Sequence, residues 1–191
     1  ETEVLLDYLD HEFVSMFFNG APLLSLEPKV PEIVVLEPEG LQVIDELLYL
    51  GEEPVDVNEF TALTSQLLSR YKVLKATQRP NGLQHYHVWN GIRLSLIRMY
   101  TLGVTGFDTP GSVMALPDAY VTMSTIREYY SLYNDVVAEI DSELAEEIMK
   151  LFEGATGMLQ LSDDFNSFDR MVYLKAYVNP LFAKLLQAQR T

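Results

Sequence analysis

Cysteine is absent from this 191-residue sequence. Without a thiol, the chain has no cysteine nucleophile, no disulfide framework, no thiolate metal site and no covalent c-type haem attachment. Histidine is scarce too, with only His11, His85 and His87. No Ser-His-Asp arrangement, P-loop or Rossmann fingerprint can be found. The chemical inventory is therefore thin, and composition and periodicity alone do not indicate a function.

Positive charge is also in short supply. The sequence has 13 Lys and Arg against 28 Asp and Glu, which gives a net charge of −15. Such a balance disfavours nucleic acid, which needs a basic footprint, and it disfavours anionic membrane surfaces. It favours a basic partner through long-range steering, although acidity can equally serve solubility alone. No uncharged apolar run reaches 18 residues, so we expect no segment that spans a bilayer.

Hydrophobic residues make up 48% of the sequence, which is typical of a soluble globular protein. A chain of this length fits one domain or at most two small ones, and we predict a single helical domain over residues 1–191. The sequence begins at Glu1 without an initiator methionine. We therefore expect that an N-terminal segment has been removed, either by a signal peptidase or in the design of the expressed chain.

The stretch from Gln84 to Gly103 predicts the central helix of the fold. It is apolar on nearly all sides, and its only formal charges are Arg93 and Arg98. Helices of this kind are usually enclosed by neighbouring elements. Residues 107–112 follow as a tight loop with proline and glycine in turn-forming order.

Helical spacing of apolar residues predicts further helices on both sides of this one. Together they predict an all-α, up-and-down bundle of about six to seven helices around the central helix. Pro180 should kink or restart the last helix, because it lacks a backbone donor. We read residues 22–37 as an extended connector, with 33–36 as loop because no second strand is evident. The other helices are expected over residues 2–19, from 38 to 51, from about 58 through 74 with a break at 79–82, from 116 through 133, from about 136 to 160, and from a cap at 166–167 through 185.

Four groups of polar or aromatic residues have structural interpretations that outweigh the functional ones. His85 and His87 would point about 160° apart on a helix, so helix-end or surface roles are favoured over a shared metal. An acidic run faintly suggests a cation loop, but it lacks the glycine and closing glutamate of the calcium hand and better fits a helix start. Three clustered tyrosines should pack between helices, and three glutamates should form a solvated face. These sets are Asp163, Asp164, Asn166 and Asp169; Tyr129, Tyr130 and Tyr133; and Glu143, Glu146 and Glu147.

Gly40-Leu41-Gln42-Val43-Ile44-Asp45-Glu46-Leu47-Leu48 resembles the signature helix of the imelysin-like proteins. In that family a glycine is followed two residues later by histidine and then by glutamate. The family consists of exported bacterial helical-bundle proteins, several of them linked to iron uptake and once described as metallopeptidases. Here Gln42 stands at the histidine position and Asp45 at the glutamate position. Because an amide is a poor substitute for imidazole on a transition metal, we expect no metal at this site.

A second resemblance involves residues 101–112 (Thr-Leu-Gly-Val-Thr-Gly-Phe-Asp-Thr-Pro-Gly-Ser), 165–170 (Phe-Asn-Ser-Phe-Asp-Arg) and 177–181 (Tyr-Val-Asn-Pro-Leu). These motifs resemble an imelysin-like region that precedes the dihaem domain in some bacterial cytochrome c peroxidases. The resemblance implies an exported, periplasmic protein whose haem lies in a following domain, with no cofactor in this chain. The implied partner is that haem domain or another periplasmic protein.

Two hypotheses follow from these resemblances. The favoured one is a non-catalytic accessory or interaction module beside a periplasmic dihaem cytochrome c peroxidase. The alternative is an imelysin-like metal-binding protein that handles iron, or a degenerate metallopeptidase. Two Cys-x-x-Cys-His motifs downstream in the complete reading frame would decide between them.

The sequence also predicts how the candidate residues are held. Arg93 and Arg98 should pair with carboxylates, because an unpaired buried charge is costly; the favoured partners are Asp45, Asp108 and Asp169. We expect Gln42 and Asp45 to form a hydrogen-bonded network with Arg93 or a tyrosine hydroxyl. In the loop, Phe107 should pack back onto the helix ends and Asp108 should accept backbone N–H bonds. With Gly40 and Arg170, these residues complete the candidate set.

Overall fold

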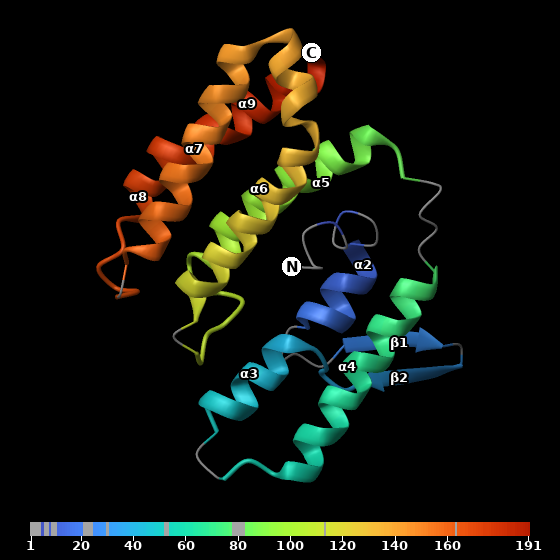
Figure 1. Ribbon diagram of the computed structural model, residues 1–191. Helices are drawn as coiled ribbons and strands as arrows, with labels where there is room; N and C mark the ends of the chain where they lie inside the picture. The colour runs from blue at the N-terminus through green and yellow to red at the C-terminus, as the bar shows by residue number, and fades with distance from the viewer. Residues whose placement is uncertain are drawn as a thin grey trace. The chain divides into compact units, whose positions relative to one another are not determined.

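The computed structural model describes residues 5, 8, 11–20, 25–29, 31–51, 54–77, 83–112, 114–162 and 164–191. Almost all of their regular structure is helical, so the architecture is all-α, as the sequence predicts (Figure 1). The backbone divides into two compact units. The larger unit comprises residues 1–9, 82–107 and 113–191, and the smaller one comprises residues 10–81 and 108–112. Whether these two units form the single domain predicted from the sequence depends on how they act together, so the single domain stays a prediction.

Four long helices form the larger unit. They pack in a ring in which each helix contacts the next and the last contacts the first, with chain order preserved around the ring. This is an up-and-down helical bundle. The four helices are α5 (His85–Arg98), α6 (Ala115–Ile140), α7 (Ser142–Gln160) and α9 (Asn179–Arg190). Three short helical pieces are also described in this unit: η3 (Met99–Gly103), which continues α5, and α8 (Arg170–Tyr173) and η4 (Leu174–Val178), which lead into α9.

The core of the larger unit lies inside this ring. The fully buried side chains there include Ile92, Leu96, Met123, Ile126, Tyr130, Ile148, Phe152, Tyr173, Leu181 and Leu185. The central helix predicted from Gln84 to Gly103 is present as α5 followed by η3. Its burial is one-sided, because Tyr86 is 53% exposed and Ile97 is 41% exposed. Although α5 is apolar on nearly all sides, only the side that faces the other three helices is buried.

Helix ends in the larger unit differ from the sequence predictions at two places. Asp141 caps α7 by accepting a hydrogen bond from the Leu144 N–H at 2.9 Å, so α6 continues to Ile140 where the sequence suggested a break near 134–136. Asp169, and not residues 166–167, caps α8 through the Val172 N–H. Pro180 does restart the last helix: the π-helical turn η4 precedes it, and it lies in the first turn of α9. A wider turn accommodates the missing proline donor.

The smaller unit contains two short helical pieces, a hairpin and two further helices. Its elements are α2 (His11–Val14), η1 (Ser15–Asn19), β1 (Ser25–Lys29), β2 (Glu32–Leu36), α3 (Leu41–Tyr49) and α4 (Val57–Thr77). Helices α3 and α4 pack against each other and against η1. Although α4 has 21 residues, only Leu74 is buried along it. Among the described residues, the smaller unit therefore buries far fewer side chains than the four-helix ring.

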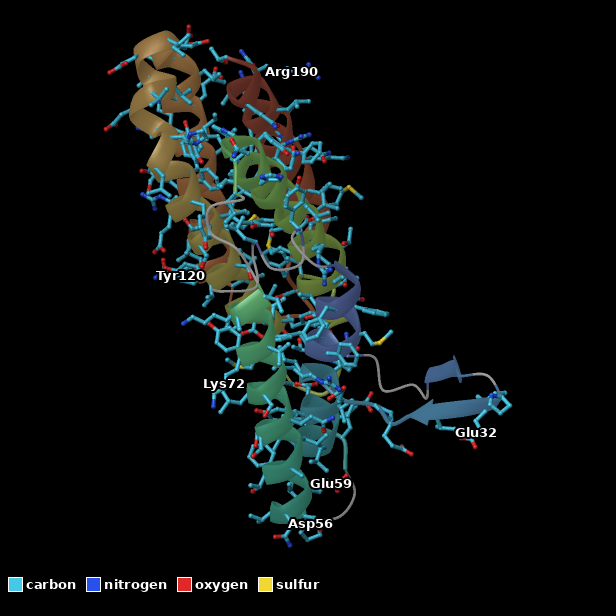
Figure 2. All side chains as sticks on the ribbon, turned by 90° about the vertical axis from the view of Figure 1, so that its right-hand side faces the viewer. Glu32, Asp56, Glu59, Lys72, Tyr120 and Arg190 are labelled. Atoms are coloured by element: carbon cyan, nitrogen blue, oxygen red, sulfur yellow. The ribbon has the colours of Figure 1, made fainter. Side chains whose placement is uncertain are left out.

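The reading of residues 33–36 as loop was wrong. They belong to β2, which pairs antiparallel with β1 and places Ile33 opposite Pro28. In Figure 2 this hairpin stands to one side of α3 and α4, with Glu32 at the start of its second strand. Proline is tolerated on an edge strand, and both strands of a two-stranded sheet are edges. That is why Pro28 did not prevent pairing.

Across the described residues, no helix combines the length and the apolar character needed to cross a membrane.

Candidate functional site

Helix α3 begins at a place where two backbone segments almost touch. Gly40 precedes it with φ of 114°, and a Cβ added there would lie 2.7 Å from the Phe18 carbonyl oxygen. A Cβ on Gly20 would overlap the Glu39 carbonyl. Only glycine fits both the conformation and the space. The helix therefore starts after Gly40, three residues later than the start at Pro38 that the sequence suggested.

Beside Gly40, an ion pair fixes α4 to this junction. The Glu39 side chain, 10% exposed, accepts a hydrogen bond from Arg70 Nη2 at 2.8 Å. The Arg70 guanidinium also stacks over the Phe17 ring, with its central carbon 4.2 Å from the ring centroid. Sequence reasoning missed this pair, because nothing in the spacing of residues 39 and 70 links them.

Gln42 and Asp45 lie on one side of α3 and are both almost fully buried. Gln42 Nε2 donates to Asp108 Oδ1 at 3.1 Å. Asp45 Oδ2 accepts from the Gly111 N–H at 2.9 Å. Residues three apart on a helix share a face, so the two side chains hold the loop 108–112 at two points. We call this arrangement the α3–loop clamp: Gln42, Asp45, Asp108 and Gly111.

The clamp brings together residues from both motifs that carry the family resemblance. A hydrogen-bonded network around Gln42 and Asp45 is present. Among the described residues, the partners of these two side chains are Asp108 and Gly111 of the loop, and neither Arg93 nor a tyrosine hydroxyl bonds to them. Gly111 is the member that sequence reasoning did not single out. The Pro110-Gly111 pair was the sequence feature that could have pointed to it. In the structure a glycine is required at this position, because a Cβ on Gly111 would lie 3.2 Å from Asp45 Oδ2 and 2.9 Å from atoms of Tyr49 and Leu50.

A second cluster lies in the larger unit, around Arg170. Its Nε donates to the Val104 carbonyl at 3.0 Å and its Nη1 to the Phe168 carbonyl at 3.2 Å. The guanidinium stacks over Phe165 at 4.2 Å, and Gly106, with φ of 76°, leaves room for the same ring. Arg170 thereby joins the segment 101–106 to the segment 165–170. Its Nη2 is buried and has no hydrogen-bond partner among the described residues.

The acidic residues before α8 act as caps. Asp164 accepts hydrogen bonds from the Asn166 and Ser167 N–H groups, each at 3.1 Å. These bonds, led by that of Asn166, lower the pKa of Asp164. Asp169 caps α8, while Asp163 lies outside the described residues. The predicted helix start is thus confirmed for Asp169, whereas Asp164 holds the turn at residues 165–167, ahead of the helix.

Arg93 does not make the carboxylate pair that the sequence predicts. Among the described residues no ion pair involves it, and its buried Nε has no hydrogen-bond partner. Instead its guanidinium stacks over Phe182 at 4.2 Å. Burial, followed by the charge of Arg190, lowers the pKa of Arg93. An aromatic face replaces the expected carboxylate, whereas the partner of Arg98 stays a prediction.

The histidines of α5 lie at its beginning. His87 Nδ1 accepts a hydrogen bond from the Gln84 N–H at 2.8 Å, and His85 Nδ1 lies 3.2 Å from the Tyr133 hydroxyl. Both therefore have the helix-end role that the sequence favours. Where the chain is described, no group of three or more His, Asp or Glu side chains is arranged to hold a metal ion. The side chain of His11 lies outside the described residues.

The tyrosines of α6 pack between helices, as predicted. Tyr130 is fully buried between the rings of Trp89 and Phe152, and Tyr133 contacts Trp89 with ring centroids 5.0 Å apart. Burial raises the pKa of Tyr130 to about 12 and also raises that of Tyr133. Phe107 differs from its prediction: it is 67% exposed and does not pack back onto the helix ends.

Comparison with protein-family models, curated proteins and solved structures finds no match to this chain.

Proposed function

We propose that this chain is a non-catalytic, imelysin-like helical module that works beside a periplasmic dihaem cytochrome c peroxidase domain and binds a partner protein. The proposal joins the sequence resemblance to one observation, the α3–loop clamp. In it, both side chains at the positions of the family's histidine and glutamate are engaged by the chain's own loop.

The clamp supports a structural use of the signature helix. A metal would need both side chains to turn toward it, but Gln42 already donates to Asp108 and Asp45 already accepts from Gly111. Both are almost fully buried, so breaking these bonds would leave polar groups unsatisfied at a cost of about 1–3 kcal/mol each. Because these buried side chains are engaged within the chain, we assign partner binding to the protein surface. The net charge of −15 suits that surface to a basic partner.

The first test is the complete reading frame. We expect two Cys-x-x-Cys-His motifs after residue 191, and two c-type haems per polypeptide when the whole protein is purified. Substituting Gln42 by alanine should leave this haem content unchanged, because the clamp lies in the present chain. A reading frame without those motifs would refute the association with a peroxidase.

The second test separates this proposal from an iron-handling role. Thermal unfolding of the 191-residue chain is measured with and without added Zn²⁺ or Fe²⁺, for the natural sequence, Gln42→Ala and Gln66→Ala. Gln66 is exposed on α4 and serves as the control. For each of the three proteins, we expect the unfolding temperature with added metal to lie within about 1 °C of its value without metal, because only a ligand that binds the folded state raises that temperature. A rise that Gln42→Ala removes and Gln66→Ala retains would establish the metal-binding alternative.

A further inference from the structure

The outer side of α6 carries a row of apolar side chains that the fold leaves exposed. Leu132 is 73% exposed, Val136 57% and Ile140 59%. They are four residues apart, so they form one stripe that extends for about 12 Å along the helix. The inner side of the same helix is fully packed, with Tyr130 and Ile126 at 0% exposure. We call Leu132, Val136 and Ile140 the α6 stripe.

A row of acidic residues follows one edge of this stripe. Glu128, Asp135 and Glu139 are all exposed, and their helical positions lie within about 60° of Leu132 on one side. None of the three has an ion pair among the described residues. From residue 128 to residue 149 the sequence contains no Lys, Arg or His. The three carboxylates beside the stripe are thus not paired with a cation among the described residues, whereas Glu146 and Glu147 of α7 pair with Lys150 and Lys184.

We propose that the α6 stripe is a docking surface for a basic amphipathic helix of a partner protein. The apolar side of that helix would cover Leu132, Val136 and Ile140, and its Lys or Arg row would meet Glu128, Asp135 and Glu139. Helix recognition of this kind relies on apolar anchors at intervals of three or four residues, with charges that fix the orientation.

Charge selects this occupant over two others. A second copy packed through the same face would bring two acidic rows together, and like charges side by side are unfavourable. An anionic membrane surface would be repelled for the same reason. The inference rests on the proposed function only in treating the chain as an interaction module. The test below uses no haem protein, so its failure would leave the association with a peroxidase standing.

The probe is an 18-residue amphipathic peptide helix with a leucine stripe bordered by lysines. Because the chain has no cysteine, one dye can be placed at Ser131→Cys, on α6 next to the acidic row, and in a second sample at Ala183→Cys, on the exposed side of α9. We expect saturable binding reported by the dye at residue 131 and no change from the dye at residue 183. Raising NaCl from 50 to 300 mM should weaken the binding severalfold.

Two sets of variants test the contacts. Leu132→Ser with Val136→Ser should weaken binding about tenfold or more, because the apolar burial is lost. Glu128→Gln with Asp135→Asn and Glu139→Gln should weaken it severalfold. The control, Glu32→Gln with Glu37→Gln and Glu59→Gln, removes the same charge from exposed residues of the smaller unit and should change the affinity less than twofold; Figure 2 labels Glu32 and Glu59.

Three results would overturn the proposal. The control triple variant could weaken binding as much as the α6 triple variant, which would mean unspecific attraction to acidity. The serine variants could lower the unfolding temperature as a core mutation does, which would mean that the chain itself covers the stripe. Alternatively, sedimentation could show that the natural chain self-associates and the serine variants do not, which would assign the stripe to a second copy.

Discussion

A single carboxylate oxygen of Asp45 holds the backbone of the loop 108–112 against α3. We predict that Asp45→Ala destabilises the chain by about 1–3 kcal/mol, because the partly buried Gly111 N–H loses its acceptor. Denaturant unfolding measures the loss, and faster hydrogen exchange at Gly111 locates it. Glu46→Ala, one residue further along α3, should cost less than about 0.5 kcal/mol. Equal effects of the two substitutions would remove the clamp from the explanation.

Tyr130 presents the opposite case, a buried polar atom without a partner. Its hydroxyl has no hydrogen-bond partner among the described residues, while its ring packs against Trp89 and Phe152. Tyr130→Phe removes only that hydroxyl, so we expect the free energy of unfolding at pH 7 to stay within about 0.5 kcal/mol or to rise. A loss of more than about 1 kcal/mol would show that the hydroxyl has a partner.

The same residue predicts a dependence on alkaline pH. Burial raises the pKa of Tyr130 to about 12, above the value near 10 of an unfolded tyrosine. Its contribution to stability is therefore complete below pH 10 and is lost between about pH 10 and 12, with a slope near 1.4 kcal/mol per pH unit. Urea unfolding from pH 9 to 11.5 should show a shallower decline for Tyr130→Phe than for the natural chain.

The sequence indicated which side chains make contacts between distant segments better than it indicated the partners of those side chains. Gln42, Asp45, Asp108 and Arg170 were selected as candidates, and all four make buried or partly buried contacts between distant segments. Their acceptors and donors are often backbone groups, such as the Gly111 N–H and the Val104 carbonyl. Backbone groups are the same at every residue, so no sequence pattern marks which one a side chain will reach.

Among the helices, the glycines of α7 provide a matched pair. Both lie inside the helix, where glycine is about 1 kcal/mol less favourable than alanine. A Cβ on Gly154 would overlap the Tyr177 ring, whereas one on Gly157 would meet nothing within 4 Å. We predict that Gly157→Ala stabilises the chain by up to about 1 kcal/mol and that Gly154→Ala destabilises it by about 1–3 kcal/mol. Thermal unfolding of both variants measures this, and a stabilising Gly154→Ala would refute the close packing of η4 on α7.

The start of α7 gives a second prediction for an element. Asp141 is its cap, and its carboxylate accepts the Leu144 N–H. Asp141→Ala should cost about 1 kcal/mol, while Asp141→Asn, which keeps the acceptor, should cost only a few tenths. Glu139→Ala removes a nearby charge without touching the cap and serves as the control. If Glu139→Ala proves as costly as Asp141→Ala, charge and not capping explains the loss.

Element boundaries show what a single sequence carries and what it lacks. The apolar spacing identified every long helix, because one buried face imposes its period on the sequence. The break between α6 and α7 was predicted too early in the chain. The apolar spacing continues from Tyr133 to Ile140 without interruption, so it does not show where one helix ends and the next begins. The Asp141 cap was the available signal, because aspartate is among the strongest capping residues. The hairpin was missed because Pro28 hid its first strand, and pairing at an exposed edge leaves no hydrophobic alternation to read.

At the scale of the whole molecule, stability should be distributed unequally between the two units. In the smaller unit, α4 buries only Leu74 over its 21 residues, whereas α6 and α7 bury fourteen side chains between them, eight in α6 and six in α7. Local opening costs less where fewer apolar contacts must break. We predict that α4 amides exchange with opening free energies at least about 2 kcal/mol below those of α6 and α7, and with a weaker dependence on denaturant. Native-state hydrogen exchange measures both quantities. Leu74→Ala should lower protection in α4 and leave that of α6 and α7 unaltered, whereas Ile148→Ala should lower it in α6 and α7. If all three helices exchange with one common free energy and one common denaturant dependence, the two units unfold together and the chain is a single cooperative domain.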